Sequence, residues 1–417
     1  MRRFTLSLIL SSLLFAPLCA SAGAMEPAQL PVLEPVFAPN EHGPPPNCMP
    51  FACYDGAVFD GRRLAAKAMD YPAVDIFARR NDGSWVLEAT LFNPNPPNVV
   101  SMPVYLRDRA FGQTLVLNGR DLLVSSYWFD ETEQQPPYAE THVFRLSDAQ
   151  WQHVQSFPHA GSLGAAEDNT VLLTSGTTVR VVRRLRGHYY HESEFSLPEA
   201  DRRPTSMSLR HGTVVFGVTS TSVPDTRGAV HVYRRFGRDW YLQQTLRPRD
   251  DDPYAHTFGS AVATDGNTVA VTAPGGLGYN SLEGGRADLY ERYGWRWRKT
   301  AVLTDPYPVQ AAEQGWRSFG GSIDVVGRRL AISASNGPDF DGLLLQTHLY
   351  ERAKHRWKLI ANTRTSSVQL RIAGGLLFAD GRPIRYGTFP RIFQWPARDW
   401  HGKEDAVVEA TAEEELD

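Results

Sequence analysis

Few residues in this 417-residue chain stand at spacings that could do chemistry. The clearest acidic turn is Asp-Phe-Asp-Gly, in which Asp339 and Asp341 flank Phe340. Calcium prefers about six to eight oxygen ligands, so two carboxylates supply only part of a site. A solvated turn fits the same residues and is the interpretation that we favour, with calcium at Asp339 and Asp341 as the alternative. No other cofactor is expected.

Catalytic motifs are missing from the sequence. It holds no H-E-x-x-H and no G-x-S-x-G, and its histidines show no metal-ligand spacing. Beyond residue 22 the only cysteines are Cys48 and Cys53, in a proline-rich segment, and we expect a disulfide that closes a tight loop. Sequence alone does not pair carboxylates that lie far apart in the chain. A dispersed catalytic site therefore stays open as an alternative.

The first residues have the pattern of an export signal. Arg2 and Arg3 precede an apolar run from Phe4 to about Leu18, and Ala20-Ser21-Ala22 is a small-residue cleavage site. The run is shorter than the roughly 20 apolar residues of a spanning helix, and no later segment is long enough. We therefore expect export to the periplasm or to the outside of the cell, with no membrane span.

The charge of the chain argues against a nucleic-acid partner. Without residues 1–22 it has 41 basic and 46 acidic residues, spread along its length. Nucleic-acid affinity comes largely from the neutralisation of phosphates by basic residues. The densest basic stretch, from Arg180 to Arg186, fits a solvated edge strand. We expect a monomer that binds a protein or a glycan at the cell envelope or outside the cell.

One pattern of strands and turns repeats seven times along the chain. Each unit begins with two apolar runs around a tight turn such as Asp265-Gly266, and six of the seven turns carry glycine. Each unit then carries two apolar or aromatic residues seven or eight positions apart. These pairs are Phe77/Trp85, Phe144/Trp151, Val182/Tyr189, Tyr233/Trp240, Tyr290/Trp297, Tyr350/Trp357 and Phe393/Trp400. Four strands per unit at a period of roughly 50 residues predict an all-β, seven-bladed β-propeller with four-stranded antiparallel blades.

Packing between blades explains the repeated aromatic residues. A single four-stranded blade cannot bury both of its faces, whereas blades packed radially bury them against each other. We therefore interpret the pairs as core and not as a ligand-stacking ladder. The fourth strand of the last unit is weak, and Leu30–Phe37 is an apolar segment that can replace it. Strands from the two ends of the chain would then close the ring.

One unit carries a more specific pattern. Residues from Phe258 to Pro274 read F-G-S-A-V-A-T-D-G-N-T-V-A-V-T-A-P, and Gly228 opens G-A-V-H-V-Y. This pattern resembles the FG-GAP repeat of integrin α subunits and of many bacterial exported proteins, and Phe111-Gly112 and Phe319-Gly320 repeat its opening pair. The resemblance implies a seven-bladed propeller with a role in adhesion or ligand recognition. The D-x-D-x-D-G calcium loops of that family are absent from the tight first hairpins here, so those sites are not carried over.

The predicted organisation follows from the repeats. Residues 1–22 form a signal peptide, 23–53 a proline-rich leader, 54–408 the propeller, and 409–417 an acidic disordered tail. The predicted blades are 54–94, 108–157, 161–197, 204–248, 255–304, 315–364 and 367–408.

Long connections of variable length indicate a binding face. In a four-stranded blade, the loops between the second and third strands and the loops between blades lie on one face, and such loops usually carry function. Exposed aromatic residues with arginine suit a protein interface or a sugar platform. The residues predicted to bind the partner are Tyr127, Trp128, Phe129, Tyr279, Trp316, Arg317 and Phe340.

We expect a non-catalytic recognition or adhesion propeller. The alternatives are a polysaccharide hydrolase or lyase with carboxylates around the central channel, and a structural part of an envelope assembly.

Overall fold

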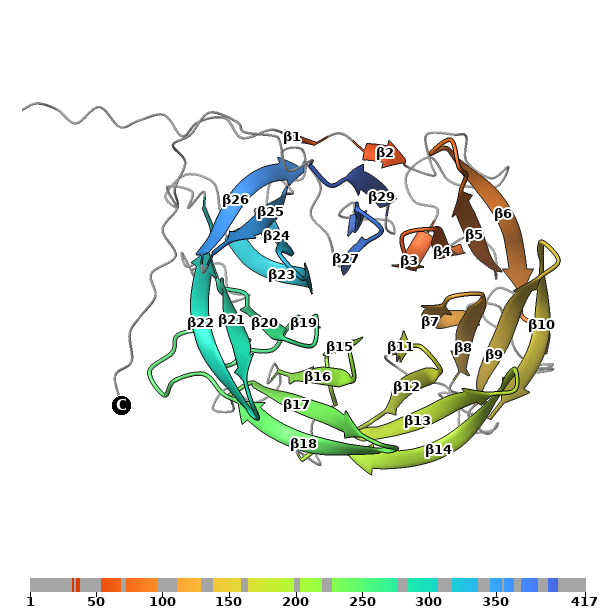
Figure 1. Ribbon diagram of the computed structural model, residues 1–417, viewed down its shortest axis with the longest axis horizontal. Coiled ribbons are helices and arrows are strands. Elements are labelled where there is room, and N and C mark those ends of the chain that lie inside the picture. Colours follow the sequence, from red (N-terminus) through yellow and green to blue (C-terminus); the bar gives the residue numbers. More distant parts are fainter. Residues whose placement is uncertain are drawn as a thin grey trace, which may run out of the picture.

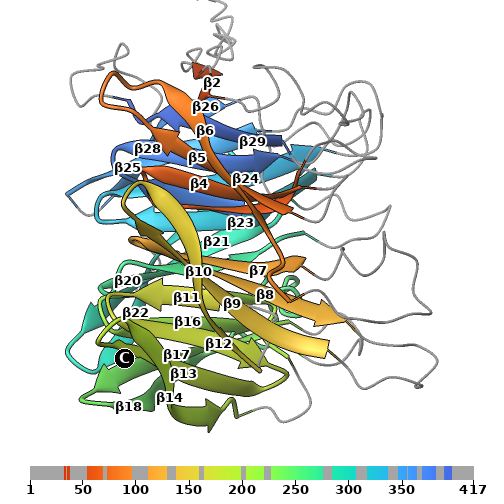
Figure 2. The same ribbon diagram turned by 90° about the vertical axis from the view of Figure 1, so that its right-hand side faces the viewer.

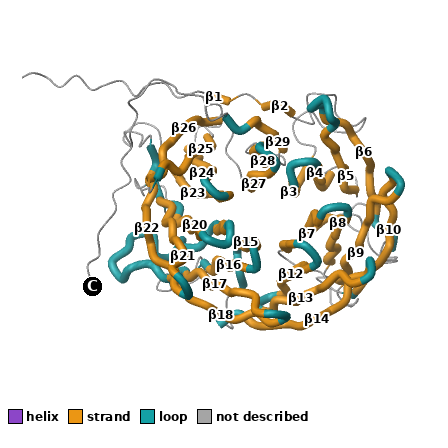
Figure 3. The backbone as a smooth tube through the Cα atoms, in the orientation of Figure 1, coloured by secondary structure: helices purple, strands orange, loops and turns teal. Residues whose placement is uncertain are grey.

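The structure, a computed structural model, describes a ring of β-sheets. It covers residues 32–33, 35–37, 54–68, 73–95, 111–128, 138–158, 164–198, 203–219, 227–275, 284–306, 317–336, 346–354, 356–363, 369–381 and 389–396. These residues form seven sheets around a central axis (Figure 1), which confirms the predicted seven-bladed β-propeller. In the side view (Figure 2) the strands run from one face of the ring to the other. Within these ranges the backbone is strand, loop or turn (Figure 3), and it holds no helix long and apolar enough to cross a membrane.

The first three blades each contain four consecutive strands, with the first strand nearest the axis. Blade 1 comprises β3 (Tyr54–Phe59), β4 (Arg63–Ala68), β5 (Ala73–Arg79) and β6 (Trp85–Phe92). Blade 2 comprises β7 (Phe111–Asn118), β8 (Asp121–Trp128), β9 (Tyr138–Ser147) and β10 (Gln150–Phe157). Blade 3 comprises β11 (Gly164–Glu167), β12 (Thr170–Ser175), β13 (Thr178–Leu185) and β14 (His188–Ser196).

The next three blades repeat this order of strands. Blade 4 comprises β15 (Ser206–Arg210), β16 (Thr213–Val218), β17 (Ala229–Phe236) and β18 (Asp239–Leu246). Blade 5 comprises β19 (Val262–Thr264), β20 (Thr268–Ala273), β21 (Arg286–Tyr293) and β22 (Arg296–Thr304). Blade 6 comprises β23 (Arg317–Val326), β24 (Arg329–Asn336), β25 (Gln346–Ala353) and β26 (Arg356–Thr363).

Blade 7 is completed by the N-terminal part of the chain. It comprises β27 (Gln369–Ala373), β28 (Leu376–Gly381), β29 (Phe389–Gln394) and, on its outer edge, β2 (Pro35–Phe37). The pairing of β2 with β29 is antiparallel, so strands from both ends of the chain close the ring as predicted (Figure 1). The short strand β1 (Val32–Leu33) pairs with β26 in parallel, which also attaches this segment to blade 6.

The tight turns between the first two strands of neighbouring blades interlock near the axis. The carboxylate of Glu167 on blade 3 accepts hydrogen bonds from the backbone amides of His211 and Gly212 on blade 4. His211 in turn donates from Nδ1 to the carbonyl of Asp265 on blade 5, at 2.6 Å. Asp265 Oδ2 accepts from the amide of Gly327 on blade 6, at 2.9 Å. Short turns are therefore needed both to form the hairpins and to join successive blades.

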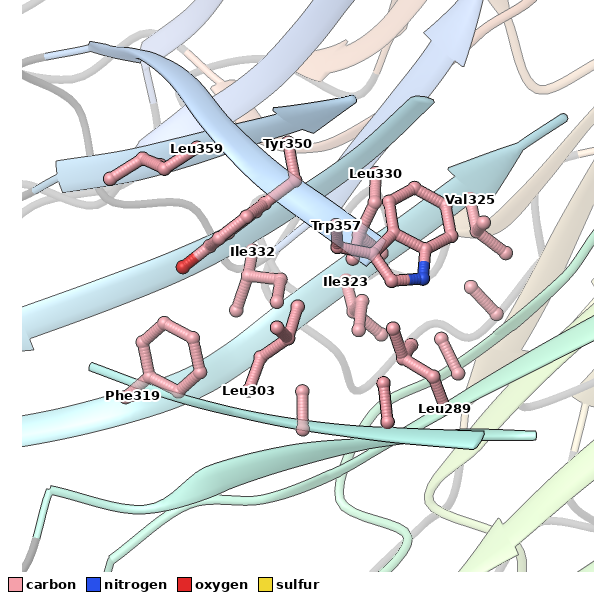
Figure 4. Packing of buried hydrophobic residues seen from close by; sticks show 14 of the residues in the cluster. Leu289, Leu303, Phe319, Ile323, Val325, Leu330, Ile332, Tyr350, Trp357 and Leu359 are labelled. Atoms are coloured by element: carbon pink, nitrogen blue, oxygen red, sulfur yellow. The ribbon is translucent and has the colours of Figure 1, made fainter. Parts of the chain in front are cut away.

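The hydrophobic core lies between the blades. Among the described residues, seven buried clusters each join two neighbouring blades. Figure 4 shows the cluster between blades 5 and 6, where Leu289 and Leu303 meet Tyr350 and Trp357. Both aromatic residues of this pair are buried, and so are the other paired residues that the structure describes, except for the partly buried Trp151. This confirms the interpretation as core for the described pairs, whereas Trp400 lies outside the described residues.

A β-bulge in the outer strand directs its two ends to different neighbours. In β18 the register shifts at Gln243, three residues after Trp240. Trp240 packs against blade 3, whereas Leu246 packs against blade 5. Side chains six positions apart in a regular strand would point to the same face, so the extra residue reverses the direction of the second half. The corresponding extra residues in β6, β10, β14, β22 and β26 are Glu88, Val154, Glu192, Thr300 and Ile360.

The Phe-Gly pairs have a structural role at the boundaries between blades. Phe111, Phe258 and Phe319 are fully buried, and the glycines that follow them, Gly112, Gly259 and Gly320, have φ angles of 85°, 92° and 100°. These φ values favour glycine. A Cβ at Gly320 would also lie 2.9 Å from Thr272 Cβ on the preceding blade. Glycine therefore permits both the turn of the backbone and the close approach of the two blades.

Candidate functional site

The predicted loop face is only partly described by the structure. Tyr127 and Trp128 end β8 and Arg317 begins β23, and these strand ends lie away from the tight turns. The other predicted residues, which are Cys48, Cys53, Phe129, Tyr279, Trp316, Asp339, Phe340 and Asp341, lie outside the described residues. The described part of the chain contains no cluster of three or more His, Cys, Asp or Glu that could hold a metal ion. The binding face, the calcium alternative and the disulfide stay predictions.

Exposed aromatic side chains gather elsewhere, on the outer rim of blades 4 and 5. Phe236 ends β17, Tyr241 and Leu242 lie on β18, and Trp295 lies in the turn before β22 (lower left in Figure 1). Phe236 and Trp295 are 60% and 63% exposed, and Tyr241 and Leu242 are also exposed. All four stand at or beside the hairpin between the third and fourth strands of a blade, on the same face as the tight turns. This surface was missed in the sequence, where the only sign of it was a second aromatic residue beside the Tyr233/Trp240 and Tyr290/Trp297 pairs.

These side chains line a groove of about 390 Å³ that crosses the boundary between the two blades. The rings of Phe236 and Trp295 stack with centroids 5.7 Å apart and planes inclined by 28°. Gln243, the bulge residue of β18, fixes the turn of blade 5, because its Nε2 donates to the carbonyl of Trp295 at 2.9 Å. Its Oε1 accepts from Trp297 Nε1 at 3.1 Å. The bulge therefore positions the groove as well as the core.

One basic side chain lines this apolar groove. Arg234 lines it, and its Nη1 is buried without an acceptor among the described residues. Outside the groove, Arg238 Nε lies 3.9 Å from Glu192 Oε1 on blade 3, and the guanidinium of Arg298 lies 5.3 Å from the ring centroid of Tyr293. Asp239, which is exposed, is the acidic residue in the same turn as Arg238. The surface thus combines an apolar floor with one arginine, and we call it the rim groove.

The connection between blades 4 and 5 holds a different, self-neutralised cluster. Asp288 is buried and forms ion pairs with Arg286 at 2.9 Å and Lys299 at 3.6 Å. Arg286 also pairs with Asp252 of the acidic run that precedes blade 5. Burial raises the pKa of Asp288, and the two cations oppose that shift. The two carboxylates and the two cations of this cluster neutralise one another, so the cluster does not call for a ligand.

The central channel bears on the enzymatic alternative. A cavity of about 450 Å³ follows the axis between the inner strands. Of the described residues that line it, Asp324 is the one with a carboxylate. Glycoside hydrolysis generally uses two carboxyl groups roughly 5–10 Å apart. The described wall of the channel does not supply that pair.

Comparison with known proteins shows the fold. No protein-family model and no curated protein sequence matches the chain. The chain is similar to the β-propeller domain of Cps50 (Swd1) from Myceliophteria thermophila, with a TM-score of 0.51 and 10% identity over 87% of this chain and 99% of that one. It is also similar to a protein from Lactobacillus plantarum, with a TM-score of 0.50 and 10% identity over 78% of this chain and 90% of that one. A periplasmic gluconolactonase from Pseudomonas aeruginosa matches with a TM-score of 0.47 and 12% identity over 78% and 95% of the two chains. At these identities the likeness to the first two proteins shows the β-propeller fold alone.

Proposed function

We propose that this propeller is a non-catalytic recognition module that binds an acidic segment of a protein partner in the rim groove. The observation that carries this proposal is the group of exposed side chains from Phe236, Tyr241, Leu242 and Trp295 on two adjoining blades. Contiguous apolar patches on soluble proteins generally mark interaction sites. Aromatic residues and arginine are also the side chains that contribute most to protein interfaces.

The composition of the groove favours a peptide over a glycan. Sugars need several hydrogen-bonding groups beside an aromatic platform, but both ends of the Gln243 amide are already bonded to blade 5. Phe236 and Leu242 offer no polar atoms and suit the apolar side chains of a peptide. Arg234 lines the groove beside these apolar side chains, and its guanidinium is the group with which a carboxylate of the partner would pair.

The FG-GAP relationship supports the same class of function. We infer this relationship from the three Phe-Gly pairs, whose phenylalanines are fully buried and whose glycines have positive φ angles. The adhesion role that the family implies is compatible with a recognition module. Export, proposed from residues 1–22, would place the module in the periplasm or outside the cell.

A panel of defined peptides tests the proposal. It contains acidic peptides with aromatic or aliphatic anchors, the same peptides with Lys in place of each acidic residue, and residues 404–417 of this chain. Fluorescence anisotropy should show binding of the acidic set that weakens with salt and falls at least tenfold in Trp295→Ala. Tyr190→Ala is the matched control, because Tyr190 is 53% exposed on the outer strand of blade 3 and should leave binding unchanged.

Three results would overturn the proposal. The first is equal binding of the acidic and basic peptides, and the second is unchanged binding in Trp295→Ala. The third is a different occupant of the groove. Binding of residues 404–417 alone would assign it to the acidic tail of the chain. A dimer in sedimentation that is lost in Trp295→Ala would assign it to a second copy.

A further inference from the structure

The channel along the ring axis contains basic residues that the rim groove does not explain. Its wall on blades 3 to 6 is built mainly from small residues, which leave the space open. These residues are Gly164, Ala165, Ala166, Ser206, Ser208, Ser260, Ala261, Gly321 and Ser322. The resulting cavity of about 450 Å³ lies within the range of small-molecule sites, which is roughly 300–1,000 Å³.

Arg210 crosses the ring at the end of the channel where the tight turns lie. It belongs to blade 4, yet its Nη2 is 3.4 Å from Asp324 Oδ2 on blade 6 and 3.3 Å from the carbonyl of Ile372 on blade 7. Both contacts are long for hydrogen bonds of a guanidinium. The Nε of Arg210 is buried and has no acceptor among the described residues. This guanidinium is therefore enclosed while much of its hydrogen-bonding capacity is unused.

Arg371 enters the channel from blade 7 at the same level. Its side chain is 38% exposed, and Asp324 Oδ1 is 4.0 Å from its Nη1. Within the described ranges no hydrogen bond is formed by its guanidinium. It therefore presents donors to the cavity.

Asp324 does not satisfy both arginines. Its side chain is 3% exposed, and its Oδ2 already accepts a hydrogen bond from the backbone amide of Ile372 at 2.6 Å. That bond joins the inner strands of blades 6 and 7. One carboxylate with a structural role thus faces two guanidiniums, which leaves a local excess of one positive charge.

We propose that this end of the channel binds the carboxylate group of a small organic acid. The planar guanidinium of Arg371 would hold the carboxylate with two hydrogen bonds, a geometry that Arg–carboxylate pairs favour. Arg210 would supply the second positive charge behind it. The site is separate from the rim groove, which lies on the outer edge of the ring, so each can be tested without the other.

Isothermal titration calorimetry with D-glucuronate, D-glucose and sulfate tests this site. Glucuronate and glucose have similar size and hydroxyl groups, and only glucuronate carries a carboxylate. We expect a binding isotherm for glucuronate and none for glucose at the same concentration. Arg371→Gln should weaken glucuronate binding at least tenfold, and Arg371→Lys should weaken it less. Arg238→Gln, which removes an exposed charge from the rim, and Trp295→Ala should leave it unchanged.

Four outcomes would overturn the inference. They are equal binding of glucose and glucuronate, no binding of glucuronate, unchanged binding in Arg371→Gln, and sulfate binding as tight as that of glucuronate. If Arg371→Gln has the same melting temperature as the wild type by circular dichroism, a loss of binding comes from the lost guanidinium and not from unfolding.

Discussion

Gly228 and the carbonyl group of Phe258 touch across the boundary between blades 4 and 5. A Cβ at position 228 would lie 1.9 Å from the carbonyl oxygen of Phe258. Gly285 has the same relationship to Phe319, where the corresponding distance is 2.6 Å. The glycine that precedes the third strand of one blade and the Phe-Gly pair of the next blade therefore form a single contact. This contact explains why the two sequence patterns occur together.

Gly228→Ala should destabilise the propeller by about 2 kcal/mol or more. The added methyl group meets a backbone carbonyl that cannot move without separating the two blades, and overpacking of this kind typically costs about 1–3 kcal/mol. Urea unfolding measures the loss. Gly284→Ala is the matched control, since its Cβ would meet no atom closer than Asp305 Cβ at 3.6 Å. Equal stability of the two variants would contradict the prediction.

Asp121→Asn should cost about 3 kcal/mol of unfolding free energy. Asp121 is fully buried, and it accepts hydrogen bonds from Arg145 Nε at 2.6 Å and from the hydroxyl of Tyr189 at 2.9 Å. Arg184 Nη1 lies 3.3 Å away. Removing one member of a buried charge cluster leaves the others unpaired, which costs about 3–5 kcal/mol.

An exposed ion pair provides the control for this experiment. Asp250 pairs with Arg227, but the side chain of Asp250 is 94% exposed. Exposed pairs contribute about 0–1 kcal/mol, so Asp250→Asn should change the midpoint of urea unfolding very little. If Asp121→Asn lowers the free energy of unfolding no more than Asp250→Asn does, Asp121 does not stabilise the boundary between blades 2 and 3.

His142 should make the fold sensitive to acid. Its side chain is fully buried, its Nδ1 is hydrogen-bonded to Ser156 Oγ at 2.9 Å, and burial lowers its pKa to about 4. Glu140 Oε2, 3.7 Å from Nε2, opposes that shift. In the unfolded chain the pKa of histidine is about 6.5, so between pH 6.5 and 4 the unfolded state binds the proton. The stability contribution is complete above pH 6.5 and is lost as the pH falls, up to about 3 kcal/mol.

Comparison with His142→Gln isolates this effect from other titrating groups. Urea unfolding at pH 7.5, 5.5 and 4.5 should show that the free energy of unfolding falls more steeply with decreasing pH in the wild type than in the variant. The difference in slope should correspond to the uptake of up to one additional proton on unfolding. Parallel pH profiles would refute the assignment to His142.

The loop face predicted from the sequence gives a further test. Replacing Tyr127, Trp128 and Trp316 with Ala should leave the melting temperature and the binding of acidic peptides in the rim groove unchanged. Of these, Tyr127 and Trp128 end β8 away from the tight turns, whereas the rim groove lies beside the hairpins of blades 4 and 5. A whole partner protein that binds the wild type should bind this variant less tightly if it also contacts the loop face. Loss of peptide binding in the triple variant would contradict the separation of the two surfaces.

The sequence by itself determined the number of blades and their strand order. Turns such as Asp265-Gly266 depend on local backbone geometry, and pairs such as Tyr233/Trp240 depend on the alternation of side chains along a strand. Both features recur in every blade, so they can be read from the sequence. The outer strand that closes blade 7 was also predictable, because the last repeat lacks an apolar fourth strand and Leu30–Phe37 has that character.

Only the tertiary structure decided where surfaces for ligands form. Phe236 and Trp295 meet because the blades pack side by side, and no local rule distinguishes them from the buried aromatic residues next to them in the sequence. Arg210 and Asp324 approach each other across the axis from blades 4 and 6. Periodic sequence signals specify contacts within a blade and between neighbours, since these recur in every repeat. Contacts that occur only once form when the ring closes and leave no periodic signal in the sequence. Both proposed sites, the rim groove and the site in the channel, consist of such contacts.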